Sequence, residues 1–219
     1  MLNSLSMQRI LFATLAFIVS SFSTQTMKAQ QQSSLNIVVE AAHGGTDAGA
    51  NVNGVKEKDL TLAYAKTIAE LGASMGINVT LARSTDARFD MNERTNLAGK
   101  SQASVYIILH ADASNNANNH GLEIFTGRNS LAMDNRVLGK FLGAELYNFG
   151  KLTVNGVNIN DTHTARLDAV KVPAALINLG YMSNNNDLSI LQNNENRLAL
   201  CKQIIKALTQ YQQYQTTPH

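Results

Sequence analysis

The sequence predicts an α/β fold, a three-layer sandwich with a mostly parallel sheet of about six strands and helices on both faces. Two observations lead to this prediction. Short, β-branched apolar runs alternate with longer segments whose apolar residues recur at helical spacing. The clearest run, 105–109, is apolar at every position, which is typical of a strand that is covered on both faces of a parallel sheet.

The first half of the chain supplies two strands and two helices. Residues 35–41 form a β-branched apolar run, so they are predicted to be a buried strand. The segment 58–72 carries leucine, isoleucine and alanine at helical spacing, and Gly76 ends that unit. A second strand is predicted at 78–82, and a short helix with an inward apolar face at 90–100.

The second half continues the alternation. The apolar run 105–109 is the best-defined strand, and 121–126 has the same character. The segment 130–147 has the spacing of a long amphipathic helix. The remaining predicted elements are a strand at 174–179, a helix at 186–192 with Asn186 as its N-cap, and a helix at 195–211.

The bulk composition indicates one globular domain. The chain has 219 residues, of which 44% are hydrophobic and 16% charged, which is enough apolar matter for a core and too little charge for disorder. Neither an internal repeat nor an interior linker is visible. We therefore expect a single domain over residues 35–214.

The N-terminal segment differs from the rest. Arg9 precedes an apolar run of about eleven residues at 10–20, and polar residues lead on to Ala29. This pattern predicts an export signal over residues 1–29, cleaved after Ala29 or at Ser23, followed by a polar linker at 30–34. The run is shorter than the roughly 20 residues of a membrane span, although an N-terminal anchor is the alternative. We expect a periplasmic or extracellular protein without a membrane span after cleavage.

The charge balance argues against a nucleic-acid partner. The chain has 18 basic and 16 acidic residues, and the predicted signal contains two of the basic ones, Arg9 and Lys28, and none of the acidic ones. The processed chain would be close to neutral and has no basic stripe. The single cysteine, Cys201, excludes an internal disulfide, and its apolar helical surroundings predict a buried thiol.

Polar residues follow the predicted strands where an α/β sheet collects its functional groups. His43 lies just beyond the first strand, His110 directly follows 105–109, and Asn178 lies near the end of 174–179. Glu57 precedes the first helix. Gly44 and Gly45 suit a turn that requires positive φ, although an ordinary loop also uses glycine.

Two histidines and one carboxylate form a common ligand set for zinc. A catalytic zinc site uses three protein ligands and leaves the fourth position open, and the ion lowers the pKa of water from 15.7 toward about 7. His43, Glu57 and His110 would supply this set. The alternative is two unrelated histidines, one in a turn and one hydrogen-bonded in the core.

Several segments resemble the zinc-dependent N-acetylmuramoyl-L-alanine amidases. EAAHGGTDAGA at 40–50 resembles the family's D-P-G-H-G-G-x-D-x-G-A, and IILHAD at 107–112 resembles I-S-I-H-A-N. PAALINLGYMSN at 173–184 is similar to P-A-V-L-V-E-L-G-F-L-S-N. Further similar segments are EKDLTLA at 57–63, LARSTD at 81–86 with the later Arg94, and GLEIF at 121–125. The likeness runs in unbroken order from about residue 36 to residue 211.

The resemblance implies a fold, a reaction and a ligand set. The fold is an α/β sandwich around a six-stranded sheet. The reaction is hydrolysis of the amide between N-acetylmuramic acid and L-alanine in peptidoglycan. The implied ligands of Zn²⁺ are His43, Glu57 and His110, and the implied partner is peptidoglycan or a muropeptide, whose binding residues the sequence does not identify.

One departure from the family bears on catalysis. Asn178 stands where the family has the glutamate that acts as general base and acid, and a carboxamide cannot take that proton. Asp112 likewise replaces the family's asparagine. Loss of general acid–base help costs on the order of 10²- to 10⁴-fold in rate.

Three interpretations are compatible with this departure. The first is a slow amidase in which Glu40, His163 or Asp112 replaces the base, although Glu40 also suits a role in orienting a ligand. The second is a catalytically inactive zinc-binding module for muropeptides or a cell-wall partner. The third is a scaffold without metal, which would leave two histidines and a glutamate at these positions unexplained.

Overall fold

The computed structural model describes residues 35–159 and 161–218, and the predicted signal and linker at 1–34 lie outside them. The main sheet has six strands in the order β4-β1-β5-β8-β6-β7. Their bounds are β1 Asn36–Ala41, β4 Asn78–Leu81, β5 Val105–Asp112, β6 Leu122–Thr126, β7 Val154–Asn158 and β8 Ala174–Tyr181. A separate two-stranded ribbon joins β2 Asn51–Val52 to β3 Val55–Lys56.

The sheet is mostly parallel, as predicted. β4, β1, β5 and β8 run parallel to one another, whereas β6 pairs antiparallel with β8 and parallel with β7. The carboxyl ends of the four parallel strands therefore meet at one edge of the sheet. Residues that leave β1, β5 and β8 gather at this edge.

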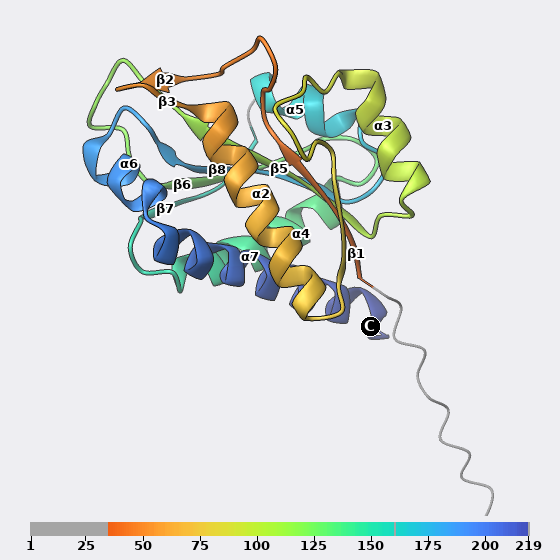
Figure 1. The fold of residues 1–219 in the computed structure, drawn as a ribbon. Coiled ribbons are helices and arrows are strands. Elements are labelled where there is room, and N and C mark those ends of the chain that lie inside the picture. The colour runs from red at the N-terminus through yellow and green to blue at the C-terminus, as the bar shows by residue number, and fades with distance from the viewer. Residues whose placement is uncertain (1–34, 160, 219) are drawn as a thin grey trace, which may run out of the picture. The chain divides into compact units, whose positions relative to one another are not determined.

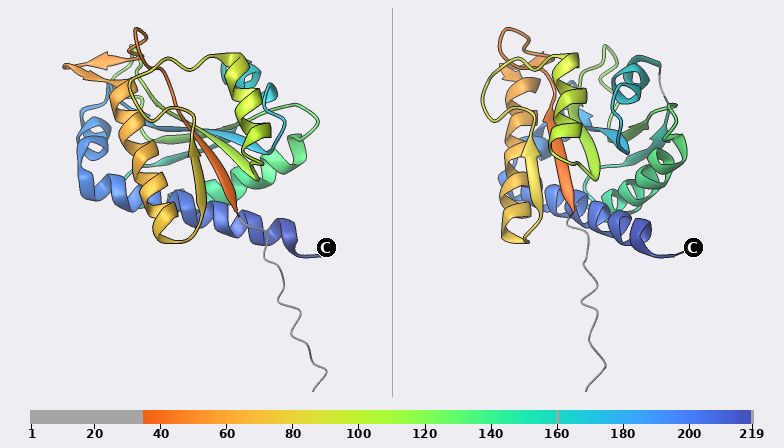
Figure 2. Two further views of the ribbon diagram at one scale, coloured as in Figure 1. Left: turned by 45° about the vertical axis from the view of Figure 1, so that its right-hand side comes forward. Right: turned by 90° about the vertical axis from the view of Figure 1, so that its right-hand side faces the viewer.

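Helices cover both faces of the sheet (Figure 1). In the right-hand view of Figure 2, α2 and α3 flank β1 from opposite sides. One face packs against α2, α4 and α7 through residues such as Ile68, Leu142 and Ile204, and the other against α3 and α5 through Ala98 and Leu167. The helices are α2 Glu57–Ser74, α3 Met91–Lys100, α4 Ala132–Tyr147, α5 Asp161–Asp168, α6 Asn185–Gln192 and α7 Asn194–Thr216.

The central strands show why the sequence selects this architecture. In β1, Ile37 and Val39 belong to one apolar core and Val38 to the other, and all three are 1% exposed or less. Side chains alternate between the faces of a strand, so a continuous apolar run requires packing on both faces. Cys201 lies in the first core, and its thiol reaches the main-chain oxygen of Tyr64 at 3.7 Å.

The structure corrects several predicted boundaries. β5 extends to Asp112, so His110 lies inside a strand rather than after it, and β8 extends to Tyr181, so Asn178 lies farther from the strand end than predicted. The N-cap of α6 is Asn184, whose side chain accepts from two backbone amides, and not Asn186. The sequence analysis did not predict β7, α5 or the β2–β3 ribbon.

Within the described residues, no helix is both long enough and apolar enough to cross a bilayer.

Candidate metal centre and adjoining pocket

His43 lies in a strained turn directly beyond β1. Its φ is 61°, a left-handed conformation that is uncommon outside glycine. The turn fixes both ring nitrogens: Nδ1 lies 2.9 Å from a carboxylate oxygen of Asp47, and Nε2 lies 3.0 Å from Oε2 of Glu57. The hydrogen bond with Glu57 is the main cause that raises the pKa of His43, and Asp47 adds to it against the opposing effect of burial.

Two glycines make room for this turn. Gly44 has a φ of 132°, and a Cβ there would collide with the carbonyl of Ala87. Gly49 has a φ of 64°, and a Cβ there would lie 2.5 Å from Cδ2 of His43 and 2.6 Å from Oε2 of Glu57. The predicted use of Gly44 at positive φ is therefore found, and Gly49 is a further position where the ligands themselves leave no space.

Glu57 is the first residue of α2 and joins the two histidines. Its Oε1 lies 2.9 Å from Nδ1 of His110 and accepts from the backbone N–H of Ala111 at 3.1 Å. Its Oε2 accepts from the backbone N–H of Ala50 at 3.0 Å. Burial by itself would raise the pKa of Glu57, but the hydrogen bonds from His110 and His43 hold that pKa well below its ordinary value.

The three residues converge on one point. One ligand atom from each of His43, Glu57 and His110 lies within 4.8 Å of the other two, although 14 and 53 residues separate them in sequence. Glu57 and His110 are buried, and the two imidazole rings meet edge to face with their centroids 5.3 Å apart. The geometry thus brings together the three residues that the sequence analysis selected.

A basic residue completes the surroundings of His110. Nη1 of Arg166, on α5, lies 2.9 Å from Nε2 of His110. A guanidinium can only donate, so Nε2 accepts and the ring proton lies on Nδ1, which faces Glu57. Sequence reasoning missed Arg166 because α5 was not predicted.

A buried network holds the turn in place. Arg83 donates to the main-chain oxygens of Ala41 and Ala42 at 3.0 and 2.9 Å, and to that of Lys58 at 2.7 Å. Lys58 in turn binds a carboxylate oxygen of Asp86 at 2.6 Å. The segment at 81–86 therefore serves to fix the exit of β1 and the start of α2, the two elements that carry ligands.

Asn178 lies beside this cluster, but its side-chain oxygen is already hydrogen-bonded to backbone N–H groups. It pairs with His110 in the β5–β8 register and is fully buried. Its Oδ1 accepts from the N–H groups of Asp112 at 3.0 Å and Gly180 at 3.3 Å, whereas its buried Nδ2 has no hydrogen-bond partner among the described residues. The side chain at this position therefore offers the cluster no acceptor that could take up a proton.

Asp112 is a carboxylate on the strand that carries His110. It is half-buried at the end of β5, and its carboxylate interacts electrostatically with His110, Glu57, Glu123 and His43. Burial is the main cause that raises its pKa, and the negative charges of Glu57 and Glu123 add to this effect. The carboxylate of Glu123 accepts from the hydroxyl of Tyr181 at 2.7 Å.

The other two candidates for the general base are Glu40 and His163. Glu40 is buried on β1, and its Oε2 accepts from the hydroxyl of Tyr106, on the neighbouring strand, at 2.8 Å. The side chain of His163 lies outside the described residues, so its role stays a prediction.

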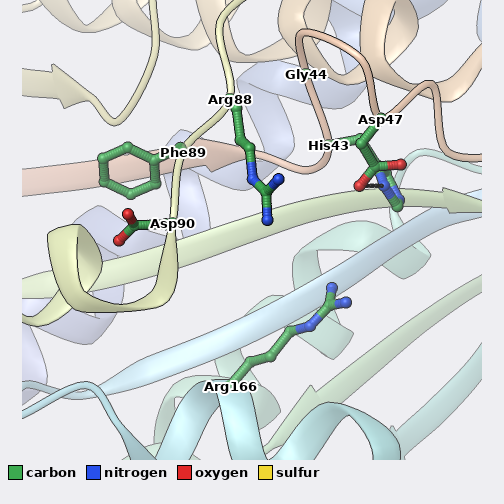
Figure 3. Close-up of a pocket in the computed structure, with 7 residues that line it drawn as sticks. All are labelled: His43, Gly44, Asp47, Arg88, Phe89, Asp90 and Arg166. Atoms are coloured by element: carbon green, nitrogen blue, oxygen red, sulfur yellow. Dashed lines mark hydrogen bonds and ion pairs between the residues drawn. The ribbon is translucent and has the colours of Figure 1, made fainter.

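A polar pocket of about 200 Å³ opens beside His43. The residues that line it come from the segment after β1, from the loop that precedes α3, and from α5. They are His43, Gly44, Asp47, Arg88, Phe89, Asp90 and Arg166 (Figure 3). A substrate that occupies this pocket would touch His43 directly. The arrangement thus combines a metal-binding donor set with an adjoining cavity that displays two guanidinium groups.

Comparisons with known proteins point to one family. A family model described as N-acetylmuramoyl-L-alanine amidase matches residues 37–210. The uncharacterised protein YqiI of Bacillus subtilis is 26% identical over 175 residues, which are 80% of this chain and 84% of that protein. The probable cell wall amidase LytH of Staphylococcus aureus is 29% identical over 178 residues, which are 80% of this chain but 57% of that protein.

Solved structures share the fold. An N-acetylmuramoyl-L-alanine amidase from Clostridium difficile 630 superposes with a TM-score of 0.76 at 22% identity, covering 84% of this chain and 99% of that one. The amidase AmiC2 of Nostoc punctiforme gives a TM-score of 0.74 at 23% identity, covering 82% and 97%. The predicted fold class is therefore confirmed.

Proposed function

Since this chain belongs to the N-acetylmuramoyl-L-alanine amidase family, we propose that it hydrolyses the amide between N-acetylmuramic acid and L-alanine in peptidoglycan, with zinc as its metal. The convergence of His43, Glu57 and His110 carries the proposal. We further propose that the protein is exported, which agrees with the predicted signal at 1–29 and with the cell-wall amidases among its relatives.

The donor set fits zinc on three grounds. Two imidazole nitrogens and a carboxylate are the ligands of many catalytic zinc sites. Nε2 of His43 and Nδ1 of His110 lie 3.0 and 2.9 Å from the two oxygens of Glu57, so all three groups face one another. Asp47 binds the other nitrogen of His43, as carboxylates do behind zinc-bound histidines. A metal ion bound to Nδ1 of His110 would require the ring proton to move to Nε2, and Arg166 would then no longer donate to that nitrogen.

The ion would supply Lewis acidity toward the scissile carbonyl and a lower pKa for the attacking water. The chain must then supply a group that takes up a proton from that water and returns one to the departing amine of L-alanine. Asn178 cannot do so, because a carboxamide does not accept a proton near neutral pH.

We assign this role to Asp112. Its carboxylate is half-buried, it interacts electrostatically with all three candidate ligands, and burial is the main cause that raises its pKa. Asp112 also adjoins the position of the missing carboxylate, because its own N–H donates to Oδ1 of Asn178. Glu40 suits a structural role instead, since it accepts a hydrogen bond from Tyr106.

Purified protein, loaded with zinc and incubated with cell-wall sacculi, should release new L-alanine amino termini. His43→Ala should abolish the release. Asp112→Asn should lower the rate by about 10²- to 10⁴-fold with zinc still bound, as expected for loss of a general base. The double change Asp112→Asn with Asn178→Glu should recover part of that loss, because it returns a carboxylate to the adjacent strand.

An inactive zinc-binding module is the second candidate. The hydrogen bonds that Oδ1 of Asn178 accepts from the backbone favour it, because they leave no catalytic base at this position. Such a module would retain sacculi in a pull-down assay without releasing amino termini. An unchanged rate in Asp112→Asn would exclude Asp112 as the base while leaving the amidase proposal intact. Wild-type release no greater than that of His43→Ala would exclude the amidase proposal itself.

A further inference from the structure

In the pocket beside the candidate metal ligands, hydrogen-bond donors outnumber the acceptors with which they could pair. Arg88 extends from the loop between β4 and α3, and Arg166 from α5 on the other side (Figure 3). Their guanidinium groups point into the same gap, in front of the His43–Asp47 pair. Each guanidinium carries five N–H donors in a planar fork that matches a carboxylate.

The two arginines use few of these donors within the protein. Among the described residues, Arg166 makes one hydrogen bond, to Nε2 of His110. The exposed side chain of Arg88 has no described hydrogen bond or ion pair within residues 35–159 and 161–218. Most donors of both groups are therefore available to a ligand.

The two acidic residues of the pocket already have partners. One oxygen of Asp47 pairs with Nδ1 of His43, and the other accepts from the N–H of Gly49 at 3.1 Å. Asp90 and Glu93 form a capping box at the start of α3: the N–H of Glu93 donates to Oδ1 of Asp90 at 3.1 Å, and the N–H of Asp90 donates to Glu93 at 2.9 Å. Among the residues that the structure describes, neither carboxylate pairs with Arg88 or Arg166, so a ligand that brings its own acceptor would complete the pocket.

We propose that Arg88 and Arg166 bind a carboxylate of the substrate's stem peptide, and that the site prefers muropeptides whose residue after L-alanine keeps a free α-carboxylate. The proposal rests on the proposed function and extends it to substrate class. The pocket includes His43, so when the L-alanine amide lies at the candidate metal ligands, this cavity is within reach of the residue that follows L-alanine. Charge-assisted, fork-like contacts are about twice as strong as neutral hydrogen bonds and select for carboxylate geometry.

Two ligands that differ in one group test this preference. They are N-acetylmuramoyl-L-alanyl-D-glutamate and its α-carboxamide, N-acetylmuramoyl-L-alanyl-D-isoglutamine. Zinc-loaded protein should cleave the carboxylate form with a kcat/KM about 10- to 100-fold higher. Calorimetry on chelator-treated protein, in which turnover is absent, should show a Kd lower by a similar factor. This second measurement decides the question even if the protein is not an enzyme.

Charge removal in the pocket should erase the preference. Arg88→Gln and Arg166→Gln should bring the ratio between the two ligands close to one, whereas Arg88→Lys should retain part of it. Arg136→Gln is the matched control, since Arg136 is exposed on α4, which packs against the opposite face of the sheet. Arg88 is also exposed in a loop, so its replacement should leave the fold intact, which far-UV circular dichroism would check.

The outcomes separate this inference from the proposed function. Equal handling of the two ligands by wild-type protein would overturn the inference, even if sacculi are cleaved at a normal rate. A preference that both pocket variants keep, or that Arg136→Gln also loses, would overturn it as well. Loss in only one pocket variant would assign the carboxylate to that arginine. Failure to cleave sacculi, combined with a preserved binding preference, would instead overturn the amidase proposal.

Discussion

At the scale of single residues, the candidate metal-binding cluster of His43, Glu57 and His110 depends on glycines as well as on its own side chains. Gly49 lies against His43 and Glu57 so closely that a single added carbon would overlap both. His43 itself occupies a left-handed conformation, held by Asp47 on one ring nitrogen and Glu57 on the other. The ligand geometry is therefore set by the turn before any ion binds.

Gly49→Ala should weaken zinc binding strongly. The new Cβ would displace the ring of His43 or the carboxylate of Glu57, and we expect a loss of at least about tenfold in affinity, the scale on which disturbed ligand orientation acts. Competition with a chromophoric chelator would measure it. Gly54→Ala is the matched control, because Gly54 also has a positive φ, 82°, but a Cβ there meets no atom within 4 Å. Equal affinities in the two variants would contradict the steric explanation.

The residues that could be predicted differ in kind from those that could not. His43, Glu57 and His110 stand out because they follow or precede strong apolar patterns and match the motifs of one family. The contact between Arg166 and His110 spans 56 residues and has no local signal. The orientation of Asn178 was equally hidden, because its oxygen is held by backbone amides whose position depends on the pairing of β5 and β8.

At the scale of elements, the long helices α4 and α7 pack on one face of the sheet and are joined by a polar clasp. Glu145 on α4 binds Nζ of Lys206 at 3.0 Å and Nε2 of Gln210 at 2.8 Å, both on α7. Burial alone would raise the pKa of Glu145, but the hydrogen bonds from Lys206, Gln210 and Asn148 lower it below its ordinary value. The clasp therefore contributes stability only when the carboxylate is ionised.

Glu145→Gln should destabilise the protein in a pH-dependent manner. The native pKa lies below the unfolded value of about 4.5, so the contribution is present above that pH and is lost as pH falls through the lower native pKa. Because Lys206 is largely exposed and solvent screens the pair, we expect about 1 kcal/mol or less at pH 7. Urea unfolding at pH 7 and pH 3 would measure it, and the difference in the free energy of unfolding between variant and wild type should be smaller at pH 3.

Glu70→Gln serves as the control for this measurement. Glu70 is exposed on α2 and makes no described hydrogen bond or ion pair within the resolved ranges. Its replacement should change the free energy of unfolding little at either pH. A constant difference between Glu145→Gln and wild type at both values would show that the clasp acts through packing rather than charge.

The three strands that were not predicted have weak sequence signals. β7 reads V-N-G-V-N, is half-exposed and lies at the edge of the sheet, where packing selects residues less strongly than in β5. β2 and β3 have two residues each, too few for a periodic pattern. By contrast, strands that are buried on both faces were predicted in type and approximate position, because their burial leaves the clearest trace in the sequence.

At the scale of the whole molecule, the sheet topology explains why three distant segments meet. β1, β5 and β8 are adjacent and parallel, so their carboxyl ends deliver His43, His110 and Asn178 to one edge, while α2 begins there with Glu57. A ligand at this edge would join elements from both halves of the chain. Zinc should therefore stabilise the fold as a whole and not only the turn.

Removal of zinc should lower the melting temperature. At a free zinc concentration 100 times the Kd, binding contributes about 2.7 kcal/mol, and about 1 kcal/mol corresponds to roughly 2–4 °C for a chain of this size. We therefore expect a decrease of about 5–10 °C on chelation, measured by differential scanning calorimetry. His43→Ala should show little response to the chelator. An equal response in that variant would mean that the stabilising ion binds elsewhere.

The burial of Cys201 makes it possible to measure ligand binding with a fluorescent label at a single site. It is the sole cysteine of the chain, it has no exposed surface, and burial raises its pKa, so it will be slow to react with maleimides at neutral pH. A cysteine introduced at Ala87, which is exposed and directly precedes the pocket residue Arg88, would thus be the one thiol that takes up a fluorophore. Emission from that dye would follow muropeptide entry in real time without first engineering a cysteine-free background.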